Sequence, residues 1–287
     1  MIFFPAAVFI AAFLLRLAHF VQFDTWDFLS NSSIDSYMHF QLAMNLVNHG
    51  SFFCGSPEQP NFTDFSGIAV SFYLAPFLWW KGIYPGLYLA KIGLLLVGSL
   101  SSVLVYTLAR QLFQNRWAAL AAGLAFAAGP LSIGETTFIM NDTLALFFFL
   151  ATMNLLAHVL RSERPSSKIV FSLGVLAGLT ALARFAYFPI LLVVFLSLLL
   201  RPKHLLLLSL AIFLTFGSWM TRYWLIKMGP HPSKFVKSMT NYAGGFLTND
   251  LPKENAPHEF ARRYRNYYFT PDDTARRFTN IWLDKLL

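Results

Sequence analysis

Asp35 and His39 are the first residues whose types and spacing suit chemistry. They stand at positions i and i+4 of a segment with apolar residues at helical spacing, so both side chains can share one helix face. A carboxylate there can take a proton from a hydroxyl group or bind a divalent cation such as Mg or Mn. No third metal ligand is evident nearby, so the sequence does not decide whether Asp35 and His39 bind a metal ion. Asp35 could equally cap the helix N-terminus, and both roles stay open.

Asp142 and Glu135 form a second acidic candidate, close to the start of the apolar segment 142–160. An ionisable group at a helix end costs less than one at the centre of a bilayer. Asp142 could therefore act in catalysis or simply cap its helix, and the sequence does not choose between these roles.

Three arginines lie near segment ends that the loop charges place outside, where arginine is uncommon: Arg16, Arg184 and Arg222. A guanidinium group forms fork-shaped hydrogen bonds to phosphate oxygens, so each is a candidate for binding the phosphate of a lipid ligand. Arg184 is the first choice. In the alternative, each reaches external headgroups or pairs with a carboxylate.

Aromatic residues make up 17% of the chain, and most should face lipid or neighbouring helices. Tyr37, Trp79 and Trp80 are exceptions, because they belong to the loop that is predicted to lie outside. Together with His39 they are candidates for lining an external cleft that binds a ligand.

The composition places these residues in a membrane protein. The 287 residues are 56% hydrophobic and 13% charged, with a mean hydropathy of +0.53, unlike a soluble domain. The net charge of +8 comes from basic residues scattered between apolar segments, which argues against nucleic-acid binding. The single cysteine, Cys54, excludes an intramolecular disulfide and a multi-cysteine metal site.

The polar stretches separate eight apolar segments, at residues 2–20, 66–82, 87–109, 117–133, 142–160, 169–186, 187–200 and 204–225. The short basic loops at 110–116, 161–168 and 201–203 are predicted to be cytoplasmic by the positive-inside rule. This orientation leaves the loop 20–86 outside. The segment 66–82 then cannot be an ordinary crossing, and its tryptophans suit a helix at the interface.

We therefore predict an all-α polytopic membrane protein with about seven transmembrane helices. The transmembrane domain covers residues 1–227, and its first external loop, 20–86, carries interfacial helices at 35–49 and 66–82. Residues 228–287 are predicted to form an external polar C-terminal segment.

Several short motifs, in this order, resemble those of the GT-C glycosyltransferases, in particular the protein O-mannosyltransferases and the lipid A aminoarabinose transferases. The first external loop is similar through the pattern Asp35, Tyr37, Ala43, Leu46 and Gly50. Further similar stretches follow at residues 106–113, 138–144, 174–184 and 218–223. The resemblance covers about residues 1–227 and implies a seven-span module with juxtamembrane helices in the first loop.

The resemblance also implies a function. It makes Asp35 the leading general base of a lipid-phosphate-sugar-dependent glycosyltransferase, hexosyl or pentosyl and inverting, that carries a monosaccharide from a polyprenyl phosphate donor to a hydroxyl of a glycan, lipid or protein. The active site is expected on the external or lumenal side of the cell inner or plasma membrane, or of the endoplasmic reticulum in a eukaryote. Many relatives carry Asp-Glu where this chain has Asp35 and Ser36, so a pair of adjacent carboxylates is absent.

Two other classes of function stay open. A transporter or lipid flippase would also place Arg and Asp in the membrane, but it predicts inverted repeats, which the sequence does not show. A non-catalytic membrane subunit or a fragment is the other alternative, since relatives usually continue with more spans.

Overall fold

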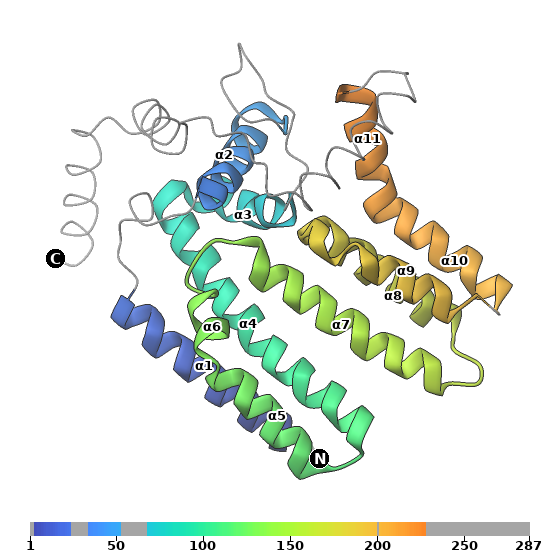
Figure 1. Cartoon of the computed structure of the whole chain (residues 1–287). Coiled ribbons are helices and arrows are strands. Elements are labelled where there is room, and N and C mark those ends of the chain that lie inside the picture. Colours follow the sequence, from blue (N-terminus) through green and yellow to red (C-terminus); the bar gives the residue numbers. More distant parts are fainter. Residues whose placement is uncertain (1–2, 24–33, 53–67, 200, 228–287) are drawn as a thin grey trace, which may run out of the picture. The chain divides into compact units, whose positions relative to one another are not determined.

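The computed structural model describes residues 3–23, 34–52, 68–199 and 201–227, and every regular element in these ranges is helical (Figure 1). This confirms the all-α prediction. The helices are α1 (Phe3–Phe23), α2 (Ile34–His49), α3 (Ile68–Lys81), α4 (Ile83–Phe113), α5 (Arg116–Ala128), α6 (Pro130–Gly134), α7 (Asn141–Arg161), α8 (Ser167–Ala183), α9 (Pro189–Ser197), α10 (Pro202–Ile212) and α11 (Ser218–Lys227). A short 3-10 turn (Phe185–Tyr187) precedes α9, and a π-helical turn (Phe213–Gly217) joins α10 to α11.

Four stretches are long and apolar enough to cross a membrane, at Phe3–Gln22, Ile83–Phe113, Asn141–Arg161 and Pro202–Arg222. Crossing takes about 20 apolar residues. Three further apolar helices are shorter, with 10–17 residues each, at Arg116–Ala128, Ser167–Ala183 and Phe185–Ser197. The chain is thus an integral membrane protein, and the count of seven spans stays a prediction. The predicted C-terminal segment at 228–287 lies outside the described residues.

The long helices pack in a fixed order. Helix α1 contacts α4 and α5, α4 contacts α7, α7 contacts α8, and α8 contacts α10 (Figure 1). Close approach depends on small residues: a Cβ added to Gly174 of α8 would lie 2.7 Å from the Cβ of Ala211, and one on Gly178 would lie 1.9 Å from Thr215 Oγ1. Small residues at such contacts let helix backbones approach in a bilayer, where water does not drive association.

Polar side chains also join the helices. Asn154 of α7 donates to the carbonyl oxygen of Leu104 at 2.9 Å and accepts from Thr107 Oγ1 at 2.7 Å, both on α4. Thr152 of α7 and Thr180 of α8 share a hydrogen bond of 3.2 Å. These bonds fix α4, α7 and α8 against one another, so the ends of these helices are held in register.

The apolar run 117–133 is not one helix. Helix α5 ends at Ala128, Gly129 is extended with φ −62° and ψ 120°, and α6 begins at Pro130. Proline has no N–H to donate to the preceding turn, so the helix is interrupted there. The interruption turns the chain before α7 begins at Asn141.

Helices α2 and α3 belong to the stretch that was predicted to be interfacial. Gly82, with φ +75°, makes the turn from α3 into α4, a backbone conformation that favours glycine. Tyr73 of α3 then donates to the carbonyl oxygen of Ala90 at 2.7 Å, which holds α3 against α4. The helices agree with the predicted ranges 35–49 and 66–82, while their position at the interface stays a prediction.

Candidate functional site

The clearest charged feature is an ion pair between Arg184 Nη1 and Asp142 Oδ1. Asp142 stands in the first turn of α7, and Arg184 follows the last residue of α8 in an extended conformation. Because α7 and α8 are consecutive and antiparallel, the start of one meets the end of the other. Arg184 keeps 45% of its side-chain surface exposed and Asp142 keeps 21%, so the pair is open to a ligand.

Glu135 joins this pair electrostatically. It directly follows α6, where burial raises the pKa of its carboxyl group and the positive charge of Arg184 partly opposes that rise. Its backbone carbonyl accepts a hydrogen bond of 3.2 Å from Thr143 Oγ1, in the first turn of α7. The structure therefore gathers both acidic candidates and the first-choice arginine at one end of the bundle.

Arg16 is in a different environment, since its side chain is fully buried in α1. Its Nη1 donates to the carbonyl oxygens of Ala12 at 3.1 Å and Ala127 at 3.4 Å, and its Nη2 donates to Ser132 Oγ at 3.3 Å. Its Nε has no hydrogen-bond partner among the described residues. The structure does not bring this arginine to the surface beside Arg184.

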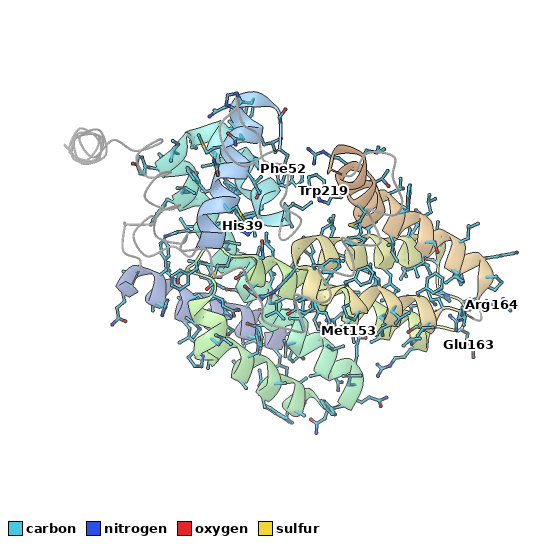
Figure 2. The ribbon with its side chains drawn as sticks, turned by 45° about the horizontal axis from the view of Figure 1, so that its top comes forward. His39, Phe52, Met153, Glu163, Arg164 and Trp219 are labelled. Atoms are coloured by element: carbon cyan, nitrogen blue, oxygen red, sulfur yellow. The ribbon has the colours of Figure 1, made fainter. Side chains whose placement is uncertain are left out.

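Arg222 lies on an aromatic cluster that the sequence did not single out. The guanidinium carbon of Arg222 is 4.5 Å from the ring centroid of Trp219. Trp219 packs edge-on against Phe52 at 5.2 Å and Phe72 at 5.9 Å, and these two phenylalanines stack at 5.1 Å; Figure 2 shows Phe52 and Trp219 turned toward one another. The cluster joins α11 and α3 to the chain that follows α2. The sequence motif at 218–223 contains Trp219, so this motif was the sequence signal that could have indicated the aromatic cluster.

His39 is fully buried rather than open to a cleft. Its Nδ1 lies 3.5 Å from Ser71 Oγ of α3, and burial lowers the pKa of the imidazole to about 4. His39 is therefore neutral at pH 7. Its neighbours Asp35 and Tyr37 are in the first turn of α2, but their side chains lie outside the described residues, so the role of Asp35 and a metal bound with His39 stay predictions.

The other aromatic candidates are at the end of α3. Trp79 and Trp80 are 76% and 66% exposed, and Lys81 Nζ lies 4.3 Å from the Trp80 ring. Exposed indole rings next to a lysine are typical of the headgroup region. Among the residues that the structure describes, no group of three or more His, Cys, Asp or Glu side chains is arranged to hold a metal ion.

These features define an all-α integral membrane protein with an acid and arginine pair at one end of its helices. Residues 89–220 match the model of the family described as dolichyl-phosphate-mannose-protein mannosyltransferase, and this stretch contains both Asp142 and Arg184. The match confirms the resemblance to the mannosyltransferase-like GT-C proteins, and it implies a membrane glycosyltransferase with a polyprenyl-phosphate sugar donor. No curated protein and no solved structure matches the chain.

Proposed function

We propose that this protein transfers a monosaccharide from a polyprenyl phosphate donor to an acceptor hydroxyl, with Arg184 binding the donor phosphate. The observation that carries the proposal is the half-exposed ion pair of Arg184 and Asp142, inside the stretch that matches the mannosyltransferase family. A guanidinium group has five N–H donors. Asp142 engages one edge of the group and orients it, which leaves the other donors for phosphate oxygens.

The proposed side of the membrane follows from charge. Arg161, Arg164 and Lys168 stand at or beyond the ends of α7 and α8 that are opposite to Asp142 and Arg184. The positive-inside rule assigns the basic ends to the cytoplasm. We therefore assign the pair, and the transfer reaction, to the external or lumenal face, where a donor in the outer leaflet can present its phosphate.

In the proposed reaction Asp35 takes the proton of the acceptor hydroxyl. The hydroxyl oxygen forms a bond to the anomeric carbon as the bond from that carbon to the phosphate oxygen breaks. The configuration inverts and polyprenyl phosphate leaves, its charge balanced by Arg184, with Arg222 as the second cation. Phosphate is a good leaving group, so one base and one cationic clamp suffice. Tyr37, Trp79 and Trp80 are the residues proposed to contact the sugar or the acceptor.

The test is transfer from a panel of radiolabelled polyprenyl phosphate sugars by membranes that contain the full chain, with and without Mg²⁺ or Mn²⁺. Wild type is expected to label an acceptor with one donor of the panel. Asp35→Asn should abolish labelling at equal expression, because an amide cannot accept the proton. The matched control is Glu163→Gln, an exposed carboxylate in the basic loop between α7 and α8 (Figure 2).

Three results would overturn parts of the proposal. Labelling that survives in Asp35→Asn removes Asp35 as the base. Donor binding without transfer to any acceptor favours a non-catalytic subunit. Movement of the intact labelled lipid between leaflets, without transfer, favours a flippase.

A further inference from the structure

The interruption between α5 and α6 creates a problem that is specific to a membrane. A helix that stops leaves its last carbonyl groups without partners, and a bilayer has no water to bind them. Here the carbonyl oxygens of Phe126, Ala127 and Gly129 fall at the break, and backbone N–H groups bind two of them: Gly129 donates to Phe126 at 3.2 Å, and Ile133 donates to Gly129 at 3.1 Å. The hydroxyl of Ser132 adds a contact to the same two carbonyls, because its Oγ lies 2.7 Å from the oxygen of Phe126 and 2.9 Å from that of Gly129.

Arg16 satisfies the third carbonyl from another helix. Its Nη1 donates to Ala127, and its Nη2 donates to the hydroxyl of Ser132, the residue that binds the other two carbonyls. Its positive charge also lies at the C-terminus of α5, where the helix dipole favours a cation. One buried side chain therefore binds both Ala127 and Ser132 at the break.

The break leads directly into the charged site. The chain continues from Ser132 to Glu135, whose pKa is raised by burial and is partly lowered again by the charge of Arg184. The backbone carbonyl of Glu135 accepts a hydrogen bond from Thr143. Thr136 and Arg16 both approach Gly98 of α4, since a Cβ placed on Gly98 would be 2.3 Å from Thr136 Cγ2 and 2.9 Å from Arg16 Nε. Arg16 thus contacts Ser132 before Glu135, and it shares the space beside Gly98 with Thr136, the residue after Glu135.

We propose that Arg16 is a positioning residue. It holds the α5–α6 break and residues 132–136, which are the end of α6 and the turn after it, in the shape that places Glu135 beside the pair of Asp142 and Arg184. The proposal rests on the proposed function for the meaning of that site. It gives Arg16 a different role from phosphate binding, because the side chain is fully buried and both Nη atoms already donate to protein oxygens. A donor phosphate could reach it only if the break came apart.

The first experiment needs no activity. Gly134 in the turn has no atom within 4 Å of an added Cβ, so Gly134→Cys with a nitroxide label fits there, in a Cys54→Ser background that removes the single native cysteine. Arg16→Met should convert the ordered spectrum of the label into a mobile one. Arg16→Lys should keep part of the ordered component, since an ammonium group can still donate to Ala127 but has no planar fork. Arg164→Met, an exposed arginine at the far loop, should leave the spectrum unchanged.

A second variant tests the same proposal if Arg16→Met does not fold. Ser132→Ala removes the acceptor of Arg16 Nη2 and the donor to Phe126 and Gly129, without a change in charge. It should loosen the label at position 134 in the same way. An ordered spectrum in both Arg16→Met and Ser132→Ala would overturn the proposal, whether or not the chain transfers sugar.

Transfer kinetics separate the two roles of the arginine once a donor is known. A positioning role predicts that Arg16→Met lowers kcat by about 10- to 100-fold, the range expected when a reacting group is displaced by about 1 Å, with KM for the donor nearly unchanged. A phosphate ligand would raise KM for the donor and leave the label at position 134 ordered. That second pattern would contradict our assignment and leave the proposed glycosyltransferase activity intact.

Discussion

Arg16 and Arg184 are the same residue type in two opposite environments. Arg16 is fully buried and donates to neutral oxygens, while Arg184 is 45% exposed and pairs with a carboxylate. A buried cation whose two Nη groups are engaged has no freedom to meet a ligand, whereas an exposed cation paired with a carboxylate does. The difference teaches that an arginine in a membrane protein indicates a ligand site only when its donors stay accessible.

Among the variants that compare the two arginines, Arg184→Ala should produce the largest effect on transfer. Loss of one charge-assisted donor that stabilises a leaving phosphate costs about 10²- to 10³-fold in rate. The free energy of unfolding should change by less than about 1 kcal/mol, because a partly exposed ion pair contributes little. Transfer assays and thermal unfolding in detergent check the two halves of this prediction.

The control for that variant is Arg164→Ala, an exposed arginine in the loop that follows the other end of α7 (Figure 2). It should keep normal transfer. Equal activity in Arg184→Ala and wild type would contradict the proposed difference between Arg16 and Arg184, since Arg184 would then be only a structural partner of Asp142.

The sequence predicted much of this fold, because apolar length and loop charge report directly on the bilayer. The helices appear where apolar runs were seen, and the bounds of α2 and α3 lie within two residues of 35–49 and 66–82, while the interfacial position of these ranges stays a prediction. The interruption at Gly129 and Pro130 was missed. The apolar residues on both sides of it resemble a single span in the sequence. A break is stable there only because other groups bind the carbonyl groups that it exposes, and the sequence does not show those partners.

The candidate site was only partly predicted, because the sequence shows the ends of segments but not the contacts between them. Asp142 and Arg184 were both identified by their positions at segment ends, but the contact between them depends on how α7 packs against α8. The role of Arg16 could not be predicted, because Ala127 and Ser132 follow it by more than 100 residues in the chain. His39 was expected in an open cleft, and only the packing of α2 on Ser71 of α3 shows that it is buried.

Gly98→Ala tests the tight contact around Arg16 and should have the second largest effect. The added methyl group would overlap Thr136 Cγ2 and press on Arg16 Nε. Overpacking of this kind costs about 1–3 kcal/mol in the free energy of unfolding. Thermal unfolding in detergent measures it, with Gly134→Ala as the matched control, since an added Cβ there meets no atom within 4 Å. Equal melting temperatures for the two variants would show that the packing at Gly98 is looser than described.

Glu135→Gln should have the smallest effect, and it is a change in pH dependence. Burial raises the pKa of Glu135 above its ordinary value of 4.5, so the folded protein holds this proton more tightly than the unfolded chain does. The stability that this group contributes is therefore fully present below about pH 4.5 and is lost as the pH rises through the raised pKa. Glutamine resembles the protonated carboxyl group and does not ionise, so the free energies of unfolding of wild type and Glu135→Gln should be similar at low pH, and wild type should become the less stable of the two as the pH rises.

The comparison of the two arginines adds a sharper form of this last test. The charge of Arg184 lowers the pKa of Glu135 against the larger effect of burial, so Arg184→Ala should move the pH midpoint assigned to Glu135 upward. Denaturation curves across pH for wild type, Arg184→Ala and each of these with Glu135→Gln isolate that midpoint. Glu163→Gln, an exposed carboxylate, serves as the control and should leave the curves unchanged. A midpoint that stays in place without Arg184 would mean that Glu135 and Arg184 do not share one site, and the acid and arginine cluster would reduce to the pair with Asp142.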